Sequence, residues 1–257
     1  MAEDAKEMQD PVAQLRHALQ GLSRLTFPTL RRPQPAPNGA PTLELVNWAV
    51  RLYCYSLLSH FREMLRSFLF LGDNGHVPAG FVVCRCLFEV GAHAYYVHKH
   101  VTQFLGAADL QNAWDFLNEI NMGSRYMREE YGEEEDWPEF VEPREIGKVI
   151  RCFDEWTGHT GQAVAEYSFL SEFAHPNMAA FSHYYNLGRT PTGDINAKFS
   201  RNFPEEPLTH ISYALEATLR FSSELLVAAG ESAIVPRLEE ILAEYNTSNL
   251  GGTDPLP

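Results

Sequence analysis

The sequence predicts an all-α protein, an antiparallel helical bundle of about six to seven helices with an extended Pro-rich N-terminal arm. Apolar residues recur at helical spacing over long stretches, and Gly, Pro and Asn separate these stretches. Strand-like alternation never lasts more than a few residues, and no internal repeat is visible. We expect an arm over residues 1–41, a bundle domain over 42–245 and a disordered tail over 246–257.

The arm combines a short helix with an extended segment. Apolar residues at helical spacing predict an amphipathic helix from Pro11 to Leu25. Five prolines then fall between Pro28 and Pro41, which indicates an extended linker. This linker could also lie across the bundle surface as a strap.

The bundle is predicted to begin with two long helices. Thr42 is a suitable N-cap for a helix that runs to about Leu71, where a Gly-Asp-Asn-Gly turn ends it. Pro78 opens a second helix that reaches about Leu105, and the short connection favours antiparallel packing. Further helices are expected over 109–131, 143–156, 161–175, 209–229 and 236–245, with a long loop over 186–207.

The charge distribution limits the ligands of this chain. The net charge is −14, and residues 129–145, an expected loop, contain nine acids and one arginine. Because duplex binding needs clustered Lys and Arg, we expect no double-stranded DNA partner. A local site for single-stranded RNA stays open, as does a protein partner or homodimer.

The expected setting is the cytoplasm. The N-terminus is acidic and lacks the apolar core of a secretory signal. The most apolar stretch contains Arg85, Glu89 and His93, so we expect no membrane span. The four cysteines lie in apolar helical stretches without metal-finger spacing, and we interpret them as reduced, buried thiols.

A stripe of polar residues marks the second long helix. Arg85, Glu89 and His93 are spaced by four in a helix that is otherwise apolar nearly all round. Buried charges need partners, so these residues must pair with one another or with facing helices. The stripe is either a structural ladder that fixes helix register or the lining of a functional site.

A second stripe lies on the fifth bundle helix. Tyr167, Ser171 and His175 also recur every four residues, and His175 could instead act as a C-terminal cap. If the two stripes form one site, Arg85 or Glu89 should lie within reach of this second stripe. A third polar face, with Ser56, His60 and Glu63 on the first bundle helix, is expected to meet solvent.

These stretches resemble a family of mostly uncharacterised bacterial helical proteins within the HEPN-like superfamily. The resemblance covers roughly residues 42–186 and is based on the Arg-x-x-x-Glu of Arg85 and Glu89 and on the Tyr-x-x-x-Ser-x-x-x-His that ends at His175. It implies a helical bundle, frequent dimerisation and, in active members, metal-independent RNA cleavage in defence or toxin–antitoxin systems. Active members have four to six residues between an Arg and a following His, whereas seven residues lie between Arg85 and His93 here. The resemblance therefore assigns no catalytic residue.

Other chemistries have less support in the sequence. Glu172-x-x-His175 fits half of a di-iron pattern, but no second copy exists, and we expect no metal. No phosphate-binding or dinucleotide motif is present, so we expect no cofactor. The leading hypothesis is an interaction or ligand-binding module with a buried Arg/Glu/His cleft, in bacterial stress or phage defence. The alternative is a divergent ribonuclease in which Arg85, His93 and His175 supply the charge and the proton transfer.

Overall fold

The structure, a computed structural model, describes residues 10–122, 145–174, 185–189, 195–199 and 206–249. Within these ranges the chain forms eight helices: α2 Pro11–Ser23, α3 Leu43–Asp73, α4 Val77–Gly106, α5 Leu110–Met122, α7 Ile146–Thr157, α8 Gln162–Glu172, α10 Glu206–Ala228 and α11 Val235–Asn249. The predicted all-α helical bundle is confirmed. The acidic segment 129–144, His175 and residues 250–257 of the expected tail lie outside the described residues. Residues 246–249, which were expected to belong to the disordered tail, form the end of α11.

The helix boundaries follow local sequence signals. The Thr42 hydroxyl caps α3 by accepting a hydrogen bond from the Leu45 amide at 3.2 Å, as expected for an N-cap threonine. The turn after α3 contains Gly75 at φ +71°, and a proline lies in the first turn of α4. The two longest helices therefore begin and end within about two residues of the predicted positions.

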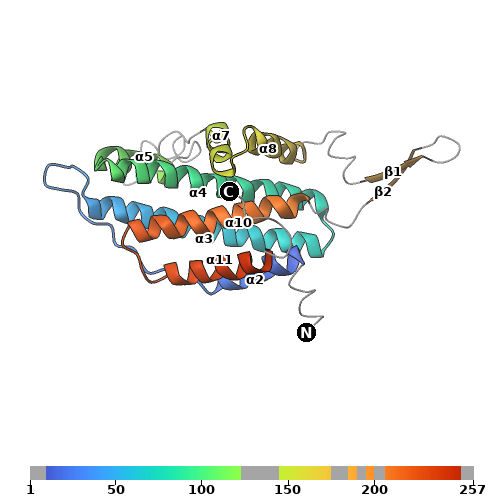
Figure 1. The fold of residues 1–257 in the computed structure, drawn as a ribbon, viewed down its shortest axis with the longest axis horizontal. Coiled ribbons are helices and arrows are strands. Elements are labelled where there is room, and N and C mark those ends of the chain that lie inside the picture. The colour runs from blue at the N-terminus through green and yellow to red at the C-terminus, as the bar shows by residue number, and fades with distance from the viewer. Residues whose placement is uncertain (1–9, 123–144, 175–184, 190–194, 200–205, 250–257) are drawn as a thin grey trace, which may run out of the picture.

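Helices α3, α4 and α10 form the long centre of the bundle (Figure 1). Gly91 of α4 lies at a close approach to α10, because a Cβ placed there would lie 2.6 Å from the Ala214 Cα. Helices α5, α7 and α8 follow one another along α4 and pack against it (Figure 1). The polar stripe of α4 therefore lies between two sets of neighbouring helices.

The N-terminal helix is part of the packed core. Asp10 caps α2 by accepting a hydrogen bond from the Val12 amide at 2.9 Å. Leu15 and Leu22 are fully buried, and α2 lies beside α11 in Figure 1. At Gly21, an added Cβ would meet the Ile241 side chain of α11. Because α2 shares the core, its loss should destabilise the whole bundle.

A short β-hairpin replaces part of the expected loop over 186–207. Strands β1 Tyr185–Arg189 and β2 Ile195–Phe199 pair antiparallel, with Leu187 opposite Ala197. Figure 1 shows the hairpin projecting away from the bundle beyond α8. The prediction of loop was wrong for residues 186–189 and 195–199, because the five-residue strands are held by pairing with each other and show no long apolar alternation.

Helix α4 is long and apolar enough to cross a membrane by length and composition alone. More than half of its most apolar window is buried inside the bundle, and core helices of soluble proteins pass the same test. The stripe that interrupts it on one side contains Arg85 and Glu89.

Candidate functional site

The centre of the candidate site is a three-residue network that joins α4 to α8. Arg85 Nε donates a hydrogen bond to Glu89 Oε1 at 3.0 Å, one turn further along α4. Arg85 Nη2 donates a second hydrogen bond to the Tyr167 hydroxyl at 2.6 Å. The guanidinium carbon also lies 4.9 Å from the centre of the Tyr167 ring, within cation–π distance. The expected proximity of the two stripes is confirmed at these residues.

This network is half-buried. The side chains of Arg85 and Glu89 are 28% and 27% exposed, whereas the sequence analysis expected a buried pair. The fully buried side of α4 contains Cys84 and Leu87, and Gly91 on this side packs against α10. The stripe is offset from that side and lies at the contact with α8, so the Arg85 side chain keeps partial contact with solvent.

The electrostatics of the network keep the Tyr167 hydroxyl protonated and the Arg85 guanidinium charged near neutral pH. Burial and the neighbouring Glu89 carboxylate raise the pKa of Tyr167, while Arg85 opposes the rise. The hydroxyl therefore stays protonated, and it can donate to Glu89 while it accepts from Arg85. Burial opposes the charge of Arg85, but the Glu89 carboxylate and the Tyr167 hydroxyl together raise the pKa of the guanidinium.

His93 does not join this network. Each step of four residues turns the stripe by about 40° around the helix axis, so His93 is rotated by about 80° from Arg85. Burial lowers the pKa of His93 to about 4, and no ion pair joins this side chain to any described residue. The imidazole is therefore neutral near pH 7, and the expected three-member stripe ends at Glu89.

The second stripe contributes only Tyr167 to the network. The Ser171 hydroxyl donates to the Tyr167 carbonyl at 2.7 Å, one turn earlier in α8. This bond turns Ser171 back onto its own helix, which leaves it a local role. His175 cannot be placed, since it lies outside the described residues.

A second polar pair, not expected from the sequence, lies next to the network. His210 Nδ1 of α10 forms an ion pair with Glu166 Oε2 of α8, the residue before Tyr167. Glu166 Oε1 accepts a hydrogen bond from Gln162 Nε2 at 3.0 Å. The His210 and Glu166 side chains are 11% and 22% exposed. Two consecutive residues of α8 thus bind one polar partner on α4 and another on α10.

The sequence contained a signal for this pair. Glu166 lies between Ala163 and Leu170, which are both buried, and His210 lies one turn before the buried Ala214. Charged or polar residues at such core-facing positions need partners in the fold. A search of every core-facing position for polar residues would have found both.

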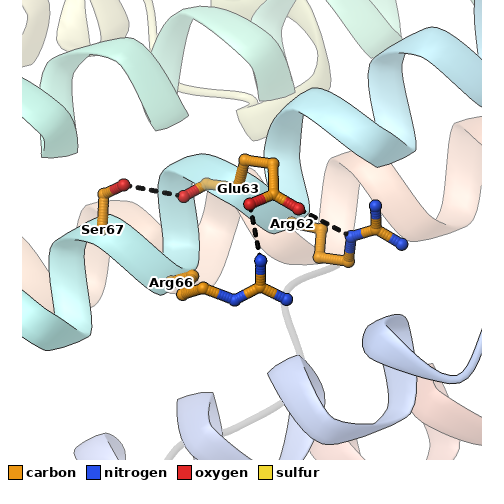
Figure 2. Close-up of polar contacts among 4 residues, drawn as sticks. All are labelled: Arg62, Glu63, Arg66 and Ser67. Atoms are coloured by element: carbon orange, nitrogen blue, oxygen red, sulfur yellow. Dashed lines mark hydrogen bonds and ion pairs between the residues drawn. The ribbon is translucent and has the colours of Figure 1, made fainter.

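The polar face of α3 meets solvent, as expected. Ser56, His60 and Glu63 are exposed. Figure 2 shows Glu63 accepting from Arg62 Nε at 3.2 Å and from Arg66 Nη1 at 2.6 Å. Exposed ion pairs of this kind contribute about 0–1 kcal/mol, so this face is a solvated surface.

Within the described ranges, no three His, Cys, Asp or Glu side chains gather as a metal site would require. No protein-family model, curated protein or solved structure matches the chain.

Proposed function

We propose that this chain is an interaction or ligand-binding module that recognises an oxyanion, a carboxylate or phosphate group, through Arg85. The supporting observation is how the guanidinium is bonded and how far the Arg85 side chain is exposed. Glu89 and Tyr167 hold two of its nitrogens, about a quarter of the side chain is exposed, and Nη1 makes no hydrogen bond to a described residue. A guanidinium oriented in this way loses little entropy when it binds an oxyanion.

The competing interpretation is a structural ladder that fixes the register of α4 against α8. A ladder needs the bonds to Glu89 and Tyr167 but does not need a further donor nitrogen on a partly exposed side chain. Because Glu89 already neutralises Arg85, a free ion should bind weakly. A larger ligand or a partner protein that adds further contacts should bind more tightly.

Ligand-dependent thermal stability separates these interpretations. The melting temperature is measured while inorganic phosphate, glutamate or a single-stranded RNA oligonucleotide is added, because binding to the folded state raises it. At least one of them should stabilise the wild-type protein, and Arg85→Gln should abolish the effect. The matched control is Arg220→Gln, since Arg220 forms the same kind of i,i+4 pair with Glu216 on α10, at 2.9 Å.

The control variant should respond to the ligand as the wild-type protein does. If no compound stabilises the protein, or if Arg85→Gln responds like the wild-type protein, Arg85 has only the structural role.

A second candidate function is metal-independent RNA cleavage, and the Glu166–His210 pair favours it. Glu166 Oε2 lies beside His210 Nδ1, a position from which a carboxylate can orient an imidazole for general acid–base catalysis. His93 is poorly suited to proton transfer at neutral pH, because burial lowers its pKa to about 4. Cleavage of single-stranded RNA in the presence of chelator should then be lost in His210→Gln and kept in the matched variant Arg220→Gln. An intact RNA pool with the wild-type protein would end this candidate.

The wider setting of the proposal comes from the sequence alone. Bacterial stress or phage defence and homodimerisation follow from the family resemblance, and the cytoplasm follows from the composition. A sizing measurement on the full chain tests the dimer directly.

A further inference from the structure

An arginine outside the Arg85 network contacts two tryptophan rings. Arg32, in the segment between α2 and α3, has its guanidinium carbon 5.7 Å from the centre of the Trp48 ring and 5.6 Å from the centre of the Trp114 ring. Trp48 belongs to α3 and Trp114 to α5, so the stack joins the segment to two helices. Both distances are within the range of cation–π contacts.

The backbone around Arg32 is held in place. Leu25 is buried in the core, and the Phe27 ring stacks on Tyr55 of α3 with ring centres 4.8 Å apart. After Arg32, the Ala36 amide donates to the Ala40 carbonyl at 3.0 Å, which closes a turn. The prolines of the segment restrict the chain further. Figure 1 shows this segment, in blue, reaching the end of the bundle where α3 begins.

Arg32 offers its hydrogen-bond donors to solvent. The residue is exposed, and so is its neighbour Arg31. The ion pairs that arginines form in the described part of the chain all involve other arginines. Aromatic rings cover the face of a guanidinium and leave the N–H donors at its edge, the arrangement that binds a carboxylate through two bonds. A chain with a net charge of −14 thus presents two adjacent arginines without a described carboxylate partner.

We propose that Arg32 is a docking point for the carboxylates of an acidic segment of a partner protein, and that Arg31 beside it adds only positive charge to the surface. The contacts with Trp48 and Trp114 hold the Arg32 guanidinium in place, so less conformational entropy of this side chain is lost when a carboxylate binds. Nucleic acid is a poorer ligand, because tracking its backbone needs more cations than two and the net charge is strongly negative. This site lies on α3 and α5 and is independent of the function proposed for Arg85.

The test is fluorescence anisotropy of a labelled hexaglutamate peptide with the full chain. The wild-type protein should bind it saturably. Arg32→Ala should weaken binding by about tenfold or more, because a charged hydrogen bond is lost. Arg32→Lys should weaken binding comparably, because lysine keeps the charge but lacks the planar guanidinium that binds a carboxylate through two hydrogen bonds. Arg31→Ala is the matched control: it removes the same charge beside the stack and should cost about threefold or less.

Intrinsic fluorescence gives an independent signal, because Arg32 contacts two of the four tryptophans. Unlabelled peptide should shift the emission of the wild-type protein and leave that of Arg32→Ala unchanged. Circular dichroism checks that Arg32→Ala, Arg32→Lys and Arg31→Ala fold. If Arg32→Ala unfolds, Arg32→Lys still tests the proposal.

Three results would overturn the proposal. They are an absence of peptide binding, equal losses in Arg31→Ala and Arg32→Ala, and tighter Arg32-dependent binding of a labelled single-stranded RNA than of the peptide. None of them bears on Arg85, whose test uses other variants.

Discussion

Gly91→Ala tests the packing that places the polar stripe. An added Cβ would lie 2.6 Å from the Ala214 Cα and 3.0 Å from both its Cβ and its carbonyl oxygen. Carbon atoms in contact prefer about 3.5–4.0 Å, so α10 would have to withdraw by about 1 Å. Overpacking of this kind costs about 1–3 kcal/mol, and the higher helix propensity of alanine returns about 0.5–1 kcal/mol. We expect a net loss of up to about 2.5 kcal/mol in the free energy of unfolding.

The assay is urea unfolding followed by circular dichroism, with Gly106→Ala as the matched control. Gly106 ends the same helix, and a Cβ there would meet nothing within 4 Å. This control should leave stability unchanged or raise it by up to about 1 kcal/mol. The reasoning would be refuted if Gly91→Ala were as stable as Gly106→Ala, because α4 and α10 would then not be packed at this separation.

Three further predictions concern the core, the pH dependence and the network. Leu15→Ala should lower the free energy of unfolding by about 2–5 kcal/mol in the same assay, and an unchanged value would place α2 off the core. The pKa of His93 is about 4 in the folded protein and about 6.5 in the unfolded chain. The contribution of the neutral imidazole to the free energy of unfolding should therefore be complete above about pH 6.5. It should fall by up to about 3 kcal/mol as the pH drops toward 4. His93→Gln should remove that part of the slope, so equal slopes in both proteins would contradict it. Tyr167→Phe keeps the ring and removes the hydroxyl that binds Arg85, and it should cost about 1–2 kcal/mol; an unchanged melting temperature would show that this bond does not form in solution.

Much of the fold could be predicted because local signals and apolar periodicity agreed. The Thr42 cap, the turn with Gly75 and the proline that opens α4 each act within a few residues, so they can be recognised without knowledge of the fold. The β1–β2 hairpin could not be found in this way. Its two five-residue strands are stabilised by each other across a turn, and neither carries a periodic signal of its own.

The candidate site could be predicted only in part. The four-residue spacing identified Arg85, Glu89 and Tyr167, but it could not show how far each is buried. That depends on the offset between the stripe and the α4–α10 contact at Gly91. The spacing also suggested that His93 belongs to the stripe, although the helix rotates it away.

The Glu166–His210 pair could not be predicted from the sequence for a different reason. Its members are separated by 44 positions, and their contact follows from the way α8 packs against α4, which itself packs against α10. Each residue can be recognised as polar at a core-facing position, but the pairing is a property of the tertiary structure. The cation–π contacts of Arg32 have the same origin, because Trp48 and Trp114 come together only when α3 packs against α5.

The central claim is that the Arg85 guanidinium is held in place and can still bind an oxyanion. Nuclear magnetic resonance of ¹⁵N-labelled protein tests it directly through the Arg85 Nε–H signal, which is assigned by its loss in Arg85→Lys. Because Nε donates to Glu89, this signal should be resolved in the free protein. We expect it to shift saturably as phosphate, glutamate or single-stranded RNA is added, while the Arg220 signal stays in place. An Arg85 signal that is present and unmoved by all three ligands would contradict the claim and leave a structural link between α4 and α8.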